Sequence, residues 1–139
     1  MAHNIIADDS LDLSNPNVQY LERADRPRLA YRRTSGTRPT VVFLPGYMSD
    51  MEGSKAQAVF EWAMRKGHGC LLLDYSGCGQ SGGQFADQTL IDWRDDVIDL
   101  IDARADGPLL LVGSSMGGWL MLLVALALSR RDGPDRIAG

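Results

Sequence analysis

The sequence predicts an α/β fold with a mostly parallel sheet and helices on both of its faces. Three uninterrupted apolar runs, TVVFL, CLLLD and PLLLVG, are typical of strands buried on both faces. Segments with the composition or spacing of helices follow them, at 54–67, 89–107 and 116–131. Strands that alternate with helices in this way form parallel sheets with crossover helices.

The chain of 139 residues is long enough for one domain. Residues 1–17 are polar, and we expect them to form a mobile N-terminal arm ahead of a partial α/β domain at 18–139. At the start of that domain, residues 18–20 and 29–31 alternate apolar and polar side chains on either side of Asp25-Arg26-Pro27. This pattern predicts two short antiparallel strands.

Each predicted helix has a recognisable apolar face or end signal. In the helix at 54–67, Ser54 is expected to cap the start and Gly67 to end it. Ala58, Trp62 and Ala63 are expected to face inward, with Phe60 as a further candidate. The helix at 89–107 has an apolar stripe opposite its aspartates, made of Leu90, Trp93, Val97, Leu100 and Ile101. The helix at 116–131 is apolar all round, which predicts burial in a larger fold.

Composition excludes several functions. A net charge of −4 argues against nucleic-acid or anionic-membrane partners, and the longest apolar run, 119–128, is too short to span a membrane. The two cysteines, Cys70 and Cys78, form no metal-binding pattern, so we expect no metal site and reduced thiols. Residues 1–17 show no signal or transit peptide, which predicts a cytoplasmic location.

The pattern G-x-S-x-G occurs twice, around Ser81 and around Ser115. It indicates a nucleophilic serine only where a strand leads directly into it and a helix leaves it at once. The match at 113–117 meets both conditions. The match at 79–83 meets neither, because its strand ends at Asp74 and no helix is expected before residue 89. We therefore predict Ser115 as a nucleophile and give Ser81 no catalytic role.

Acyl transfer to a serine needs two N–H donors for the negative charge that develops on the carbonyl oxygen. The residue after the nucleophile, Met116, is expected to supply one. The segment FLPGYMSD follows an earlier strand, and Tyr47 is the candidate for the other. Small neighbours are needed at such a turn, so supporting roles are expected for Gly46, Gly113 and Gly117.

A nucleotide site is a weaker alternative. Residues 77–82 also match G-x-G-x-x-G, but no helix opens within the motif, and the next strand ends in Val112-Gly113 without the acidic residue that such sites use. The segment GYMSDMEGSK lacks the Gly-Lys-Ser/Thr ending of a phosphate-binding loop.

Three segments, FLPGYMSD, LLLDYSGCGQSGG and LLLVGSSMGGWLM, resemble the oxyanion loop, the D-x-x-G-x-G-x-S segment and the nucleophile turn of the α/β-hydrolase family, in the family's order. More narrowly, PGYMSDMEGSKA, DYSGCGQSGG and VGSSMGGWLML resemble the subgroup of mitochondrial palmitoyl-protein thioesterases within the α/β-hydrolase-domain group, and their bacterial relatives. The resemblance covers about residues 18–139. It implies hydrolysis of thioesters or carboxylic esters, with a small acyl ester or an S-acylated protein as substrate and no cofactor.

In that family the catalytic acid and histidine follow the nucleophile turn. No histidine follows Ser115 here, His3 lies in the arm, and His68 precedes a buried strand. Asp132 and Asp135 come too early to match the family's acid. We therefore expect both groups beyond Gly139, and expect the segment 133–139 to begin a further strand.

Two readings remain open. The chain is either the front part of a serine esterase or thioesterase, inactive without its base and acid, or a non-catalytic binding module that depends on a partner to cover its sheet edge.

Overall fold

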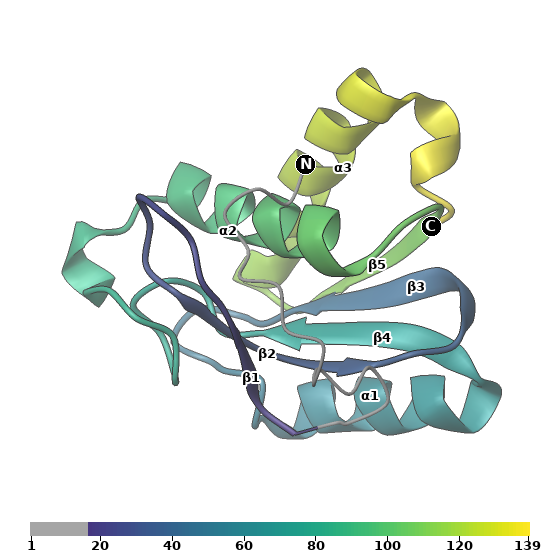
Figure 1. The fold of residues 1–139 in the computed structure, drawn as a ribbon, viewed down its shortest axis with the longest axis horizontal. Helices are drawn as coiled ribbons and strands as arrows, with labels where there is room; N and C mark the ends of the chain where they lie inside the picture. Colours follow the sequence, from purple (N-terminus) through teal and green to yellow (C-terminus); the bar gives the residue numbers. More distant parts are fainter. Residues whose placement is uncertain (1–16) are drawn as a thin grey trace.

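A computed structural model describes residues 17–139 of the protein, in which one five-stranded sheet carries three helices (Figure 1). Residues 1–16 of the predicted N-terminal arm lie outside the described residues. The strands are β1 (Gln19–Leu21), β2 (Leu29–Thr34), β3 (Thr37–Leu44), β4 (His68–Leu73) and β5 (Leu109–Gly113), and the helices are α1 (Ser54–Lys66), α2 (Leu90–Arg104) and α3 (Met116–Asp132), with short 3-10 turns η1 (Phe85–Asp87) and η2 (Pro134–Arg136).

The strand order in the sheet is β1-β2-β4-β3-β5. β3 runs parallel to both β4 and β5, while β1 and β2 form the predicted antiparallel pair at one edge. At the other edge, Ile137 bridges Leu109 in parallel, and the Ala138 N–H donates to the Leu109 carbonyl at 2.8 Å. The mostly parallel sheet that the three apolar runs predict is therefore confirmed.

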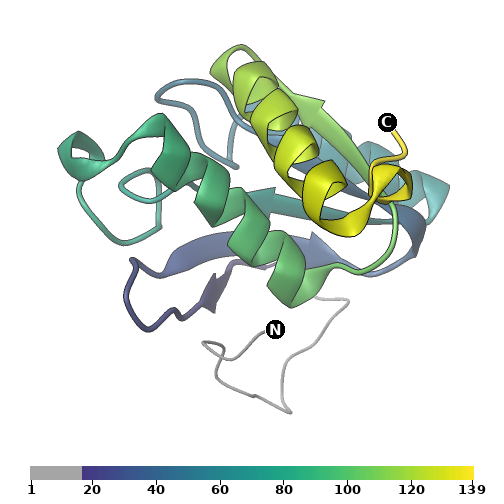
Figure 2. The same ribbon diagram turned by 90° about the horizontal axis from the view of Figure 1, so that it is seen from above.

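Helices cover both faces of the sheet, as predicted. Successive side chains of β3 point to opposite faces, so Val41 and Phe43 pack towards α1, while Val42 and Leu44 pack in a second cluster with α2 and α3. Figure 1 shows α1 on one side of the sheet and α2 and α3 on the other, and Figure 2 shows the latter two side by side.

The inward face of α1 matches the predicted one only in part, because Phe60 and Ala63 are buried but Ala58 is exposed. Ala56, Phe60 and Ala63 are buried, whereas Trp62 is partly exposed and stacks its ring on His68 at 5.7 Å. The spacing i, i+4, i+7 of the buried residues gives a complete helical stripe. Gly53, not Ser54, is the N-cap residue, and Gly67 ends the helix with φ 76°, as predicted.

α3 is buried along one stripe only. Leu120, Val124 and Leu128 face the core, while Trp119 is 68% exposed. Within the described residues the sheet, α2 and η2 pack on α3 and leave its other side exposed, so the predicted burial in a larger fold stays a prediction. No helix within residues 17–139 is long and apolar enough to cross a membrane.

α2 begins with a capping box, in which Thr89 Oγ1 accepts the Asp92 N–H at 3.1 Å and Asp92 Oδ2 accepts the Thr89 N–H at 2.8 Å. Trp93, Val97, Leu100 and Ile101 are buried as predicted, but Leu90, the first residue of the helix, is 40% exposed.

One aspartate of α2 is fully buried, contrary to the prediction that these residues face outward. Asp96 lies 3.0 Å from an Arg23 nitrogen and 2.9 Å from an Arg26 nitrogen, and it accepts the N–H and the hydroxyl of Ser76 at 2.7 and 2.9 Å. Paired charges and hydrogen bonds satisfy the buried carboxylate. The cluster joins the connection between β1 and β2 to α2 and to the loop after β4.

Candidate active site

The site forms where β3 and β5 end together. Leu44 and Gly113 are register partners, so the chains that follow them leave the sheet side by side. The Ser114 N–H donates to the Leu44 carbonyl at 3.2 Å and keeps the two chains paired one residue further. This arrangement brings the segment of Tyr47 next to that of Ser115.

Ser115 occupies a strained turn between β5 and α3. It is the N-cap residue of α3 with φ 57° and ψ −120°, and its side chain is exposed. A positive φ in a residue with a Cβ atom costs of order 1–3 kcal/mol and persists only where the surrounding structure imposes it. The turn therefore presents the hydroxyl to solvent at the positive end of a 17-residue helix.

Close backbone packing imposes this turn. A Cβ atom on Gly113 would overlap the Gly117 carbonyl, and a Cβ atom on Gly117 would overlap the Leu44 carbonyl oxygen. A Cβ atom on Gly46 would lie 3.1 Å from the Ser114 oxygen and 3.3 Å from the Ser115 Cβ atom. The three predicted supporting glycines are thus at the points where the loop, the strand and the helix touch.

The loop after β3 turns sharply at Gly46, whose carbonyl accepts the Ser49 N–H at 3.1 Å. Tyr47 is 58% exposed, and Met48 has φ 55°. Within residues 17–139, the backbone N–H groups of Tyr47 and Met116 donate no hydrogen bond to the protein. Both predicted donors are therefore free to bind an oxygen of a ligand.

Two consecutive residues directly after β4 hold this loop, and neither was predicted from the sequence as a site residue. The Tyr75 hydroxyl donates to the Pro45 carbonyl at 2.7 Å, and Asp74 Oδ1 accepts the Met51 N–H at 2.9 Å. Both side chains are buried, and burial raises the pKa of each. The available signal was period-2 alternation, which puts Tyr75 on the same face as Leu73.

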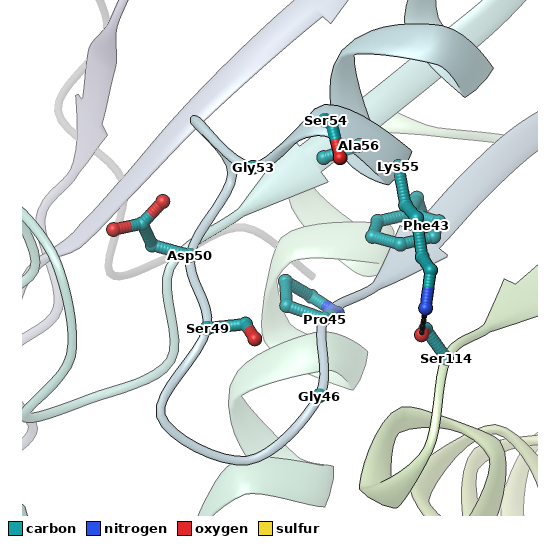
Figure 3. Close-up of a pocket in the computed structure, with 10 residues that line it drawn as sticks. All are labelled: Phe43, Pro45, Gly46, Ser49, Asp50, Gly53, Ser54, Lys55, Ala56 and Ser114. Carbon is teal, nitrogen blue, oxygen red and sulfur yellow. Dashed lines mark hydrogen bonds between the residues drawn. The ribbon is translucent and has the colours of Figure 1, made fainter.

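A cavity of about 250 Å³ lies between this loop and the start of α1 (Figure 3). On its wall the Lys55 ammonium donates to the Ser114 hydroxyl at 3.3 Å, a contact that Figure 3 shows as a dashed line. Ser114 borders this cavity and Ser115 does not. A second cavity of about 220 Å³ includes Met48, Cys78 and Phe85 in its wall.

The second G-x-S-x-G match has a structural role. The Ser81 hydroxyl donates to the Asp74 carbonyl at 2.6 Å and accepts the Ala30 N–H at 2.8 Å, so it is fully engaged with backbone. It ties the loop after β4 to β2. This placement agrees with the expectation that Ser81 is not a nucleophile.

The glycine-rich loop is folded around a carboxylate. The Gln80 N–H donates to Asp74 Oδ2 at 2.8 Å, and a Cβ atom on Gly79 would overlap the same carboxyl group. Negative charge at this position disfavours a phosphate. Within residues 17–139 no group of three or more His, Cys, Asp or Glu side chains lies close enough to hold a metal ion.

Neither His68 nor Asp132 is placed to act as a base or an acid at Ser115. His68 begins β4, at the opposite end of the parallel strands from Ser115, and its ring stacks on Trp62. Asp132 ends α3, 17 positions after Ser115, and pairs with Arg131 and Arg136. His3 lies outside the described residues.

Comparison with known proteins shows what this arrangement is similar to. The family model described as "Alpha/beta hydrolase family" matches residues 41–138. The chain is 50% identical over 111 residues to the protein named "Palmitoyl-protein thioesterase ABHD10, mitochondrial" of Homo sapiens, and 48% identical to that of Mus musculus. These alignments cover 80% of this chain and 36–37% of those proteins, so the chain spans about a third of their length.

Solved structures have the same fold. Alpha/beta hydrolase domain-containing protein 10 from mouse superposes with a TM-score of 0.81 at 45% identity, over 87% of this chain and 46% of that chain. A putative hydrolase from Agrobacterium vitis S4 gives 0.79 at 34% identity, over 88% and 49%.

The predicted cytoplasmic location is contradicted by the curated relatives, whose names place them in mitochondria. That prediction depended only on the composition of residues 1–17. The names of the relatives overturn it, because they point to mitochondria. The resemblance that the three motifs indicate is confirmed. From the family match over residues 41–138 and the identity to these relatives, the chain belongs to the alpha/beta hydrolase family.

Proposed function

We propose that this chain supplies the nucleophile and the oxyanion donors of a serine hydrolase that cleaves thioesters or carboxylic esters. The observation that carries the proposal is the exposed Ser115, held at φ 57° at the start of α3 and close to the loop of Gly46. The N–H groups of Tyr47 and Met116 donate to no other group within residues 17–139. The names of the relatives, palmitoyl-protein thioesterases, support an S-acylated protein or a small acyl ester as the substrate.

In the proposed reaction the Ser115 oxygen attacks the acyl carbon, and negative charge develops on the former carbonyl oxygen. The Met116 and Tyr47 N–H groups donate to that oxygen, and the N-terminal end of α3 adds a favourable field. The thiol or alcohol leaves with a proton, which forms an acyl-enzyme. Water then attacks the acyl carbon, the bond from that carbon to the Ser115 oxygen breaks, and the serine regains a proton as the carboxylic acid is released.

A serine hydroxyl needs a base to remove its proton, and we propose that the histidine and its acid come from chain beyond Gly139. The position of His68 at the far end of β4 supports this, because it is the only histidine within residues 17–139. Without that base, this segment alone is expected to be nearly inactive. The proposed steps require no cofactor.

The test is Ser115→Ala in the full-length protein, meaning this segment with whatever chain flanks it naturally. Hydrolysis of an acyl thioester and of a p-nitrophenyl ester should fall by about 10⁴-fold or more, as for other nucleophile deletions. Labelling by a fluorophosphonate, which reacts with activated serines, should also disappear. The matched control is Ser81→Ala, the serine of the other motif, which should retain labelling per folded molecule.

Full hydrolysis by the Ser115→Ala protein would overturn the proposal. Tight acyl-ligand binding without any turnover by the wild-type protein would favour the non-catalytic module instead.

A further inference from the structure

Among the described residues, the Tyr75 hydroxyl is the one side-chain group that forms a hydrogen bond with the Pro45 carbonyl. The two atoms are 2.7 Å apart and buried, and Tyr75 is 1% exposed, so it has no access to a substrate in the site. A backbone carbonyl only accepts, so the hydroxyl must donate. Its ring is fixed by stacking on Trp93, at 5.7 Å between centroids.

This hydrogen bond sets the orientation of one peptide plane. In a trans peptide the C=O and the following N–H point in opposite directions within one plane. Holding the Pro45 carbonyl towards Tyr75 therefore fixes the plane that Pro45 shares with Gly46. The next plane contains the Gly46 carbonyl and the Tyr47 N–H, and the Ser49 N–H holds that carbonyl at 3.1 Å.

The two planes together determine where the Tyr47 N–H points. The second hydrogen bond is local to the turn and moves with it, so it fixes the shape of the turn but not its place. The bond from Tyr75 joins the turn to the core, and the packing of Gly117 against the Leu44 and Pro45 carbonyls joins it to α3. Asp74 holds the far end of the same loop through Met51.

We propose that Tyr75 is a positioning residue, which acts through the Pro45–Gly46 peptide to hold the Tyr47 N–H at the oxyanion position. This inference rests on the proposed function and adds a residue to it. Without the hydroxyl, the Pro45 carbonyl is a buried acceptor with no partner, and its peptide plane gains freedom to rotate. The donor is then displaced from the developing charge, while the substrate still binds.

The test is Tyr75→Phe in the full-length protein, with Tyr31→Phe as the matched control. Tyr31 is also fully buried, and its hydroxyl accepts from Arg104 Nε at 2.7 Å, on β2 and away from the loop. Tyr75→Phe should lower kcat about 10- to 100-fold and leave KM within about threefold, because misplacing a donor loses less than removing one. Tyr31→Phe should leave kcat unchanged per folded molecule.

A second readout separates positioning from a general loss of structure. A boronic-acid inhibitor, which forms a tetrahedral adduct on the serine, should lose affinity in Tyr75→Phe by the same factor as kcat. The product acid, a ground-state ligand, should not lose affinity. An equal loss for both ligands, or a wild-type kcat in Tyr75→Phe, would overturn the inference.

If Tyr75→Phe does not fold, 4-fluorophenylalanine and 4-aminophenylalanine at position 75 replace it. Both occupy the place of the hydroxyl, but only the amine donates, so kcat should be higher with the amine. Equal kcat values would overturn the inference. Failure of the proposed function is distinguishable, because then Ser115→Ala itself retains activity.

Discussion

The backbone of Gly117 lies so close to the carbonyl oxygen of Leu44 that a Cβ atom on Gly117 would overlap it. The first turn of α3 therefore packs directly on the end of β3. Any side chain at position 117 must push the helix away from the loop that carries Tyr47, which alters the site and the core together.

We expect Gly117→Ala to lower the free energy of unfolding by about 1–3 kcal/mol, as for other overpacked positions. In the full-length protein the proposed esterase or thioesterase activity per folded molecule should fall as well, because the helix start moves. The control is Gly118→Ala, where an added Cβ atom meets nothing within 4 Å. Alanine there should be neutral or stabilise the helix by up to about 1 kcal/mol. Equal stability of the two variants in urea unfolding would contradict the packing argument.

Asp96 and Asp99 both pair with Arg23, but only Asp96 is fully buried. We expect Asp96→Asn to destabilise the fold by about 3 kcal/mol, because the buried Arg23 and the partly buried Arg26 lose a shared counter-charge. Asp99 has a side chain that is 40% exposed, so Asp99→Asn should change stability by about 1 kcal/mol or less. Thermal and urea unfolding of both variants would measure this difference, and similar losses would show that burial does not govern the cluster.

Substitution of Ser81 should affect mainly the stability of the protein, whereas substitution of Ser115 should affect mainly its proposed activity. Ser81→Ala removes the acceptor of the Ala30 N–H and should reduce stability by about 1–3 kcal/mol. Ser115→Ala removes an exposed hydroxyl and should stay within about 0.5 kcal/mol of wild type. Calorimetry on both proteins tests this, and a strong destabilisation by Ser115→Ala would mean that its hydroxyl has a structural role.

Cys70 should make stability fall in alkaline solution. Burial raises the pKa of its thiol from the usual 9.0 to about 12. The unfolded chain loses this proton first, so stability is full below pH 9 and declines from there towards pH 12, with a slope approaching about 1.4 kcal/mol per pH unit. In Cys70→Ala this contribution is absent. Urea unfolding at pH 8, 9.5 and 11 should show a shallower decline for the variant, and parallel declines would contradict the assignment.

Local sequence patterns predicted the elements and the turn at Ser115 because each depends on neighbours in the chain. The apolar run at 109–112, the glycines at 113 and 117 and the helix that follows all lie within about twenty residues. Periodicity likewise predicted most of the buried stripe of α2. The proposed roles of Ser115, Tyr47 and Met116 stay predictions until activity is measured.

The rest depends on contacts between distant segments. Asp96 lies on the inward stripe of α2 by its spacing from Trp93 and Leu100, but its burial requires Arg23, more than seventy positions earlier. The bond from Tyr75 to Pro45 joins segments 30 positions apart. Helical spacing shows which face a residue occupies but not which partner meets it, so neither contact could be predicted from the pattern.

The pairing of Leu44 with Gly113 also has a consequence for how the protein is made. The two halves of the site are synthesised about seventy residues apart, and they meet only when β5 docks on β3. Such non-local contacts form late in folding. Closing the long intervening chain costs conformational entropy before the contacts contribute any favourable free energy. A nascent or partly unfolded chain would therefore lack the proposed pairing of Ser115 with the Tyr47 N–H, which forms only with the completed centre of the sheet.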